Sequence, residues 1–283
     1  MNYQERGQRD IQRVWDVKPE RKGNGHTAGM VLPPGNWAAF DPFLLMAEDW
    51  FQQGTFPFHP HRGMETVTFV IDGKLKHEDN HGGSGVLEAG DVQWMTAGKG
   101  IVHSEDPLPE ETVHSLQLWV NLPSARKMTE PRYQDLRSVN APVRREDGAV
   151  IRVFSGSSSD VTADTLNNVP VTYVELELEA GSSVSQDLPG NYNGFLYILE
   201  GSGRFGKDET YGERNQVLWL GASNGEAELE SEIRIRAEAP LRAILVAGEP
   251  IGEPVVAGGP FVMNTEEEIR QAYADYRAGK FGK

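Results

Sequence analysis

The chain has 283 residues, of which 38% are hydrophobic, enough apolar material for two packed domains and too much for a disordered protein. It contains no cysteine, which excludes disulfides, zinc–thiolate sites and thiol catalysis. The formal net charge of -15 repels a phosphate backbone, so we expect no direct binding to nucleic acid. No apolar run is long enough for a membrane span, and the N-terminus lacks the apolar core of a signal peptide. We therefore expect a cytoplasmic protein.

The first half of the chain predicts short strands separated by glycine-rich turns. Residues 65–85 alternate apolar and polar side chains around Asp72-Gly73, which indicates a β-hairpin. Further short strands are predicted within residues 85–98, 101–107 and 114–123, with a turn at Ala89-Gly90. Many short strands with regular turns are typical of a sandwich or a barrel.

A second set of strands follows a polar stretch, residues 132–147, which we interpret as a linker. The strand pattern restarts at residue 149 and continues to residue 250. Residues 195–205 repeat the pattern of residues 66–76, an apolar run followed by an acid, a glycine and a second strand. This similarity indicates an internal duplication. We therefore predict an all-β protein with two barrel domains, residues 1–135 and residues 136–283.

The C-terminus is predicted to be helical. Thr265 and Glu268 have the spacing of a capping box at the start of this helix, and Gly279 is suited to its C-cap. The helix has one apolar face, made of Ile269, Ala272, Tyr273 and Tyr276. Such a face is typical of a helix that packs against a barrel.

The positions of the histidines indicate where a metal site can form. All seven lie before residue 115, so a histidine-based metal site can form only in the first domain. Residues two apart on a strand point to the same face, about 6.5 Å apart. The pairs His59/His61 and His103/Glu105 both have this spacing, and two such pairs on facing strands can converge on one point. Three imidazoles and one carboxylate suit Fe(II), Ni(II), Co(II), Cu(II), Mn(II) or Zn(II). We predict one divalent transition metal here.

The carboxylate ligand has two candidates. Glu65 lies four residues after His61 and is expected to share its strand parity, so the residues alone do not choose between Glu65 and Glu105. The remaining histidines are weaker candidates for ligands. His77 and His81 lie in a polar stretch that is typical of a loop, and His114 precedes an apolar strand and is expected to be structural.

The sequence resembles the pirin family of the cupin superfamily. The resemblance is most specific in FHPHRGMETVTFVIDG (58–73), KHEDNHGG (76–83), GDVQWMTAGKGIVHSE (90–105) and LQLWVNLP (116–123). It extends to FDPFLLMAEDWF (40–51) and to EEEIRQAYADYRAGKFG (266–282). Four residues separate Gly98 from His103, where the common cupin motif has two, and Thr96 replaces its proline. Pirins share both departures.

The resemblance implies two cupin barrels with one metal, usually iron as Fe(II), in the N-terminal barrel only. It also implies that the metal ligands are His59, His61, His103 and Glu105, which favours Glu105 over Glu65. Several pirins resemble quercetin 2,3-dioxygenases, which open a flavonol ring with O₂ and release carbon monoxide. Others act as metal-dependent regulators through protein partners, and the fold does not choose between these activities.

If the protein is a dioxygenase, the metal binds the flavonol hydroxyl as an oxyanion and Glu105 accepts its proton as general base. The walls of the site are then expected to be apolar, to hold a flat aromatic substrate. The candidates for these walls, by position near the ligand strands, are Phe56, Phe58, Met64, Phe69, Trp94 and Trp119.

Overall fold

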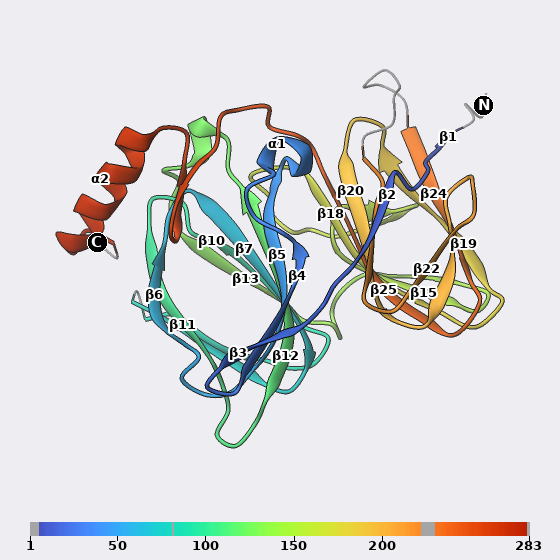
Figure 1. Ribbon diagram of the computed structural model, residues 1–283, viewed down its shortest axis with the longest axis horizontal. Helices are drawn as coiled ribbons and strands as arrows, with labels where there is room; N and C mark the ends of the chain where they lie inside the picture. The colour runs from blue at the N-terminus through green and yellow to red at the C-terminus, as the bar shows by residue number, and fades with distance from the viewer. Residues whose placement is uncertain (1–5, 81, 222–229, 282–283) are drawn as a thin grey trace. The chain divides into compact units, whose positions relative to one another are not determined.

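The computed structural model describes residues 6–80, 82–221 and 230–281. His81 lies outside these residues. The regular structure is almost entirely β, which confirms the predicted fold class. Contacts divide the chain into two compact units (Figure 1). We call Pro19–Val139 with Ile251–Lys283 the histidine barrel, and Met1–Lys18 with Asn140–Pro250 the second barrel. Within the described residues, no helix is long and apolar enough to cross a membrane.

The histidine barrel is built from two main sheets. The larger contains, in spatial order, β13 (Arg132–Leu136), β10 (Val92–Thr96), β7 (Met64–Asp72), β12 (Val113–Asn121), β5 (Phe43–Phe51), β4 (His26–Leu32) and β3 (Glu20–Gly23). The smaller contains β6 (Phe56–His61), β11 (Ile101–Pro107), β8 (Leu75–Asp79) and β9 (Ser84–Leu87). Outside these sheets lie the helices α1 (Trp37–Phe40) and α2 (Glu266–Arg277), the 3-10 turn η1 (Ser124–Arg126), and the paired strands β26 (Val256–Gly258) and β27 (Phe261–Met263).

The second barrel has the same construction. Its larger sheet contains, in spatial order, β14 (Val143–Glu146), β15 (Ala149–Ser155), β18 (Val171–Leu178), β25 (Leu241–Gly248), β20 (Asn193–Glu200), β23 (Gln216–Trp219) and β2 (Arg13–Asp16). Its smaller sheet contains β1 (Gly7–Gln8), β24 (Glu230–Ala237), β21 (Ser202–Phe205) and β22 (Thr210–Glu213), with β19 (Ser183–Pro189) paired to β24. A short pair, β16 (Ser157–Ser158) and β17 (Val161–Thr162), completes it.

The strand order supports the internal duplication. In the histidine barrel β7 lies between β10 and β12, and in the second barrel β20 lies between β23 and β25. The strands after the two similar turns also correspond, because β8 pairs with β9 and β11 while β21 pairs with β22 and β24. The two segments that look alike in sequence therefore occupy the same place in two barrels of one topology.

The predicted hairpin at Asp72-Gly73 is wrong in its pairing. The turn forms, with Gly73 at φ +87°, but β7 and β8 do not pair with each other. The chain passes here from the larger sheet to the smaller one. A Cβ at Gly73 would lie 2.7 Å from the carbonyl oxygen of Thr112, so the turn packs directly against another part of the chain. Local turn chemistry predicts a reversal of direction, whereas the pairing depends on distant strands.

The predicted linker, residues 132–147, contains two strands. β13 pairs with β10 at the edge of one sheet and β14 pairs with β15 at the edge of another. Their polar side chains suit edge strands, which remain partly exposed. The two units also differ from the predicted ranges 1–135 and 136–283 at both ends of the chain. The N-terminal strands β1 and β2 pair with β24 and β23 of the second barrel, and the C-terminal segment belongs to the histidine barrel.

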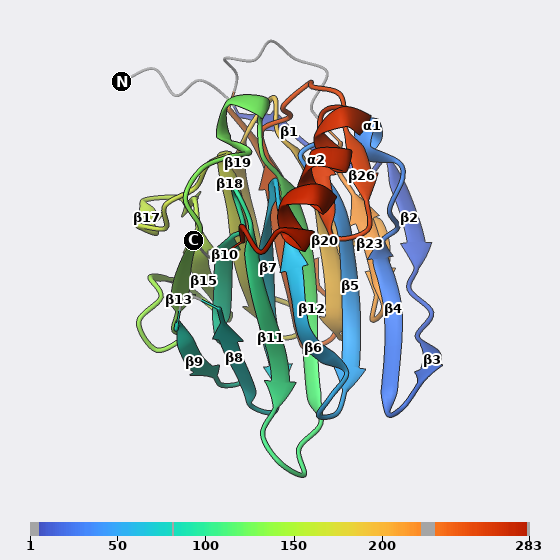
Figure 2. The same cartoon turned by 90° about the vertical axis from the view of Figure 1, so that its left-hand side faces the viewer.

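The C-terminal helix forms as predicted. Thr265 and Glu268 make a capping box, and Gly279 after the helix has φ +65°. On the apolar face Ala272 is fully buried, while Tyr276 remains 38% exposed. Phe261 and Phe281 join Ala272 in one buried cluster. Figures 1 and 2 show α2 along the outside of the histidine barrel, near β6.

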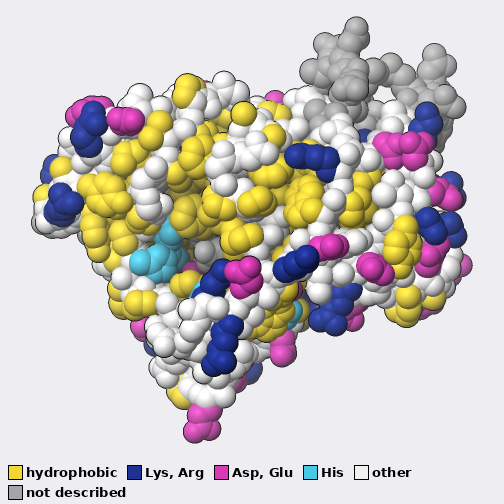
Figure 3. Space-filling model, viewed as in Figure 1, with side chains coloured by type: hydrophobic (Ala, Val, Ile, Leu, Met, Phe, Trp, Pro, Cys, Tyr) yellow, Lys and Arg dark blue, Asp and Glu magenta, His cyan; other side chains and the backbone are white. Residues whose placement is uncertain are grey.

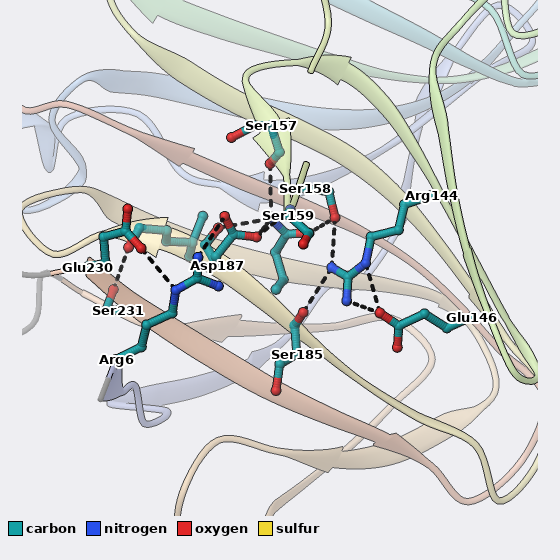
Figure 4. A network of polar contacts seen from close by, with 12 residues as sticks. Arg6, Arg144, Glu146, Ser157, Ser158, Ser159, Ser185, Asp187, Glu230 and Ser231 are labelled. Carbon is teal, nitrogen blue, oxygen red and sulfur yellow. Dashed lines mark hydrogen bonds and ion pairs between the residues drawn. The ribbon is translucent and has the colours of Figure 1, made fainter. Parts of the chain in front are cut away.

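Polar side chains tie the N-terminal segment and the edge strands to the second barrel. Arg144 on β14 donates to Ser158 Oγ and to the carbonyl of Ser185, and it pairs with Glu146 (Figure 4). Arg9 is buried, with 2% of its surface exposed. Its guanidinium donates to Ser231 Oγ and to the carbonyl oxygens of Pro189, Gly190, Tyr192 and Gly221. Arg9 therefore holds the N-terminal segment in place.

We expect Arg9→Ala to destabilise the second barrel strongly. The substitution leaves several buried carbonyl groups without donors, and we expect a loss of at least about 3 kcal/mol in the free energy of unfolding. The measurement is urea denaturation followed by tryptophan fluorescence. Arg6→Ala is the control, because Arg6 is partly exposed and its ion pair with Glu230 is expected to contribute at most about 1 kcal/mol. Equal losses in the two variants would contradict this role for Arg9.

Candidate metal centre

Three predicted ligands come together inside the histidine barrel. His59 and His61 lie on β6 and His103 lies on β11, which are adjacent antiparallel strands. His103 is the register partner of His59, so their side chains point to the same side. One ring nitrogen from each histidine lies within 4.8 Å of the others. The alternation of side chains on two paired strands therefore produces a cluster that could hold a metal ion.

The ring nitrogens of this cluster are available. His61 and His103 are 2% and 0% exposed, and none of their four ring nitrogens has a well-aligned hydrogen-bond partner among the described residues, although the backbone of Pro260 interacts with the ring of His61. Buried polar atoms without a partner are rare in proteins and often mark the position of an ion or ligand. His59 is half-buried, and its Nδ1 lies 2.8 Å from the carbonyl oxygen of Pro57. That contact fits donation from Nδ1, which leaves Nε2 free to bind a metal.

Burial keeps the inner imidazoles neutral. Burial, together with the neighbouring His59, lowers the pKa of His61 from 6.5 to about 3, while the backbone of Pro260 acts in the opposite direction. Burial also lowers the pKa of His103 well below its usual value, with further contributions from the other histidines. A neutral imidazole has the lone pair that a metal requires, so neither histidine has to lose a proton before it binds a metal.

Glu105 lies beside the three histidines, but its carboxylate is not part of the group of ligand atoms that lie within 4.8 Å of one another. It is 3% exposed, and the register of β11 with β6 shifts between His103 and Glu105, with the extra residue on β6. Its Oε1 accepts from Thr68 Oγ1 at 3.1 Å and its Oε2 accepts from Gln117 Nε2 at 2.8 Å. Burial raises the pKa of this carboxyl, whereas His59 and the two hydrogen bonds lower it. Thr68 and Gln117, which the sequence did not single out, therefore fix the carboxylate.

Glu65 faces the other side of its sheet. β6 ends at His61 and β7 begins at Met64, and Gly63 between them has φ +81°, so strand parity does not carry over from His61 to Glu65. On β7 the side chain of Thr68 points to Glu105, and Glu65, three positions away, points to the opposite face. Glu65 accepts from Trp94 Nε1 at 3.0 Å and from Thr96 Oγ1 at 2.7 Å. The expected shared parity of His61 and Glu65 is wrong.

The remaining described histidines lie outside the cluster. His26 and His114 each pair with a carboxylate at 2.8 Å, Asp49 and Glu48 respectively, which fits the structural role predicted for His114. The loop predicted for His77 is wrong, because His77 lies on β8 and is only 3% exposed. It is the register partner of Glu105, and its ring stacks on Tyr133 with centroids 5.1 Å apart.

The candidate wall residues separate into three groups. Trp119 lies against His61, with ring centroids 5.2 Å apart, and it packs with Met64 in one cluster. Phe69 and Trp94 belong to the buried face of β7 and β10 that points away from the site, so they are core residues. Phe56 packs on Phe51, and Phe58 is 56% exposed beside His59. Figure 3 shows histidine at the surface bordered by hydrophobic side chains.

We expect the metal-free protein to lose stability in acid because of His61. Its folded pKa of about 3 lies below the unfolded value of 6.5, so between these values the unfolded chain binds the extra proton. The contribution of His61 to the free energy of unfolding is therefore greatest above about pH 6.5 and decreases as the pH decreases. Between about pH 7.5 and about pH 5, wild type is expected to lose about 2 kcal/mol more than His61→Gln. Urea denaturation of both proteins at both pH values measures this difference. The same pH dependence in both would show that His61 titrates normally.

Comparison with known proteins agrees with the fold. The family model described as Pirin matches residues 34–120, and the model described as Pirin C-terminal cupin domain matches residues 173–282. A pirin-like protein of Solanum lycopersicum is 45% identical over 268 residues, 94% of this chain and 90% of that protein. A Geobacillus kaustophilus crystal structure is 58% identical, with a TM-score of 0.87, over 89% of this chain and 100% of that chain. A quercetin 2,3-dioxygenase structure from Acinetobacter baumannii is 31% identical, with a TM-score of 0.83, over 98% of this chain and 99% of that chain. The chain belongs to the pirin family of cupin proteins.

Proposed function

We propose that this protein is a metal-dependent oxygenase of the quercetin 2,3-dioxygenase type, which opens a flavonol or similar phenolic ring with O₂. The observation that carries the proposal is the cluster of His59, His61 and His103, whose inner ring nitrogens are buried without well-aligned hydrogen-bond partners. The similarity to the Acinetobacter baumannii enzyme over nearly the whole chain supports the reaction class.

We propose that the metal is held by His59, His61, His103 and Glu105. Three imidazoles and a carboxylate suit Fe(II), which we favour, and also Ni(II), Co(II), Cu(II), Mn(II) or Zn(II). When bound, the metal supplies a Lewis acid for the substrate oxygen and a redox centre for O₂. Glu105 follows His103 by two residues and shares its strand, and its carboxylate is already oriented by Thr68 and Gln117.

The chain's own part in the reaction is to bind the substrate and accept its proton. Glu105 is the buried carboxylate beside the histidines, and burial makes it a stronger base than an exposed glutamate. We assign it the removal of the proton from the substrate hydroxyl. Half-buried His59 and exposed Phe58 mark the side from which a flat aromatic molecule can enter. Trp119 against His61 provides an apolar wall on the inner side.

A second candidate is a non-enzymatic, iron-dependent regulator that acts through a protein partner. The observation that favours it is the exposed side chain of Phe58, which adjoins a candidate metal ligand. A partner that contacts this residue would lie next to the metal and could respond to its oxidation state. The two candidates share the same metal site and differ in whether a small phenolic molecule is consumed.

Turnover with a flavonol distinguishes these two candidates. Protein loaded with Fe(II) under anaerobic conditions is expected to consume O₂ and release carbon monoxide when quercetin is added. His59→Ala removes one ligand and is expected to abolish both signals. The measurements are an oxygen electrode and carbon monoxide detection, with metal content determined on the same samples. Stoichiometric iron without any O₂ uptake would reject the oxygenase and favour the regulator.

We expect Glu105→Gln to lose most turnover, by about 100-fold or more, because the amide cannot accept the substrate proton. The three histidines remain, so the variant is expected to retain part of its metal. Glu65→Gln is the matched control, since Glu65 is a buried glutamate on the opposite face of β7, and its turnover is expected to stay close to wild type. Steady-state rates and metal content are measured for both variants. Full turnover in Glu105→Gln would reject its role as base.

A further inference from the structure

The C-terminal segment contacts the chain immediately after His61. The backbone N–H of Val262 donates to the carbonyl of Arg62 at 3.0 Å. A Cβ at Gly63 would lie 2.0 Å from the carbonyl oxygen of Val262, so only glycine allows this close approach. Lys127, which is buried, donates to the carbonyl oxygens of both Gly63 and Val262 at 2.9 Å. The end of the ligand strand β6 and the strand β27 are thus joined through backbone atoms.

Arg62 connects three parts of the barrel from a buried position. It is 5% exposed, and its Nε donates to the carbonyl of Lys99 at 2.6 Å, in the turn that leads into β11. Its Nη1 donates to Asp275 Oδ2 on α2 at 2.9 Å. Its guanidinium also lies over the ring of Phe281, 4.4 Å from the ring centroid. One side chain next to His61 therefore contacts the turn before His103 and the C-terminal segment.

A second connection reaches the strand of His103. The backbone N–H of Val102, next to His103, donates to Asn80 Oδ1 at 3.1 Å, and Asn80 Nδ2 donates to the carbonyl of Phe281 at 3.0 Å. The ring of Phe281 also packs on Gly100, where an added Cβ would lie 2.8 Å from ring atoms. Phe281 is 6% exposed and packs in the cluster of Phe261 and Ala272. The last part of the chain thus contacts both ligand strands.

The ion pair at the centre of these contacts is shielded from water. The side chains of Arg62 and Asp275 are 6% and 13% exposed. Asp275 also accepts from Lys280 and Gln271, both at 2.8 Å. Hydrogen bonds from Lys280 and Arg62 hold the pKa of Asp275 well below its usual range. Removal of Asp275 would leave the buried guanidinium of Arg62 without its ion-pair partner, whereas removal of Arg62 leaves Asp275 paired with Lys280.

We propose that the segment from Phe261 to Phe281 is a positioning device for the metal centre, with Arg62 and Phe281 as its positioning residues. It sets the distance between the end of β6, which carries His61, and the start of β11, which leads to His103. Metal sites require their ligands to be held within about 0.5 Å, and supporting contacts of this kind change metal affinity by about 10- to 100-fold. The inference rests on the metal site proposed above.

The test compares metal binding in three full-length variants with that of wild type. Arg62→Met keeps the apolar stem and removes the guanidinium, and Phe281→Ala removes the ring. Arg270→Met is the matched control, because Arg270 is an exposed arginine of α2, the helix that carries Asp275, and it pairs with Glu267. Co(II) affinity is measured by competition with a chelator, and the Co(II) absorption spectrum reports the geometry of the ligands. We expect Arg62→Met and Phe281→Ala to lose about 10- to 100-fold in affinity with an altered spectrum. Arg270→Met is expected to match wild type.

If Arg62 and Phe281 only stabilise the fold, the measurements are expected to differ from those above. The two variants would then have lower melting temperatures but an unchanged Co(II) affinity and spectrum, and that outcome overturns the proposal. If Arg62→Met does not fold, Phe281→Ala alone decides.

Hydrogen exchange in the metal-free proteins separates this inference from the proposed function. Faster exchange is expected at the backbone amides of β6 and β11 in Phe281→Ala and not in Arg270→Met. Unchanged exchange would reject the inference. A wild-type protein that binds no metal would reject the proposed function instead.

Discussion

The candidate metal centre is built around an unfavourable feature of the histidine barrel, the burial of two uncharged imidazoles without well-aligned hydrogen-bond partners. A buried polar atom without such a partner costs free energy, and His61 and His103 together contribute four such nitrogens. The surrounding contacts keep this arrangement in place: Pro57 orients His59, while Thr68 and Gln117 hold Glu105. A metal ion would satisfy one nitrogen of each ring, so the binding free energy of the ion and the stability of the barrel are linked.

The second barrel has the same topology but contains no histidine. The strands β19 and β24 correspond to β6 and β11, and their buried positions include Val184, Ile233 and Ile235 in a large apolar cluster. Buried Arg9 in this barrel has five acceptors, whereas Arg152 Nε, Asn167 Nδ2 and Tyr173 OH are buried without a hydrogen-bond partner among the described residues. Two barrels of one fold thus use their interiors differently, one for apolar packing and one for a group of ligand atoms.

The sequence predicted the parts of this structure that depend on local patterns. The spacing of His59, His61 and His103 on strands followed from side-chain alternation, as did the all-β class and the capping box of α2. Glu65 could not be placed, because the break at Gly63 changes the parity of the chain between two strands. The pairing of β2 with β23 could not be predicted either, since a strand of four residues carries no signal for a partner about 200 residues away.

The position of β6 explains why a distant segment is needed near the histidines. Among the described residues β6 is the edge strand of its sheet and pairs there with β11 alone, and Pro57 and Pro60 lack backbone donors. An edge strand of this kind is the part of a sheet that separates most easily, yet it carries two of the three histidines. Contacts from the C-terminal segment, including strand β27, to Arg62 and Gly63 restrain its end. An arginine and a glycine directly after the candidate ligand His61 thus anchor the strand that carries it, although the side chain of neither could bind a metal.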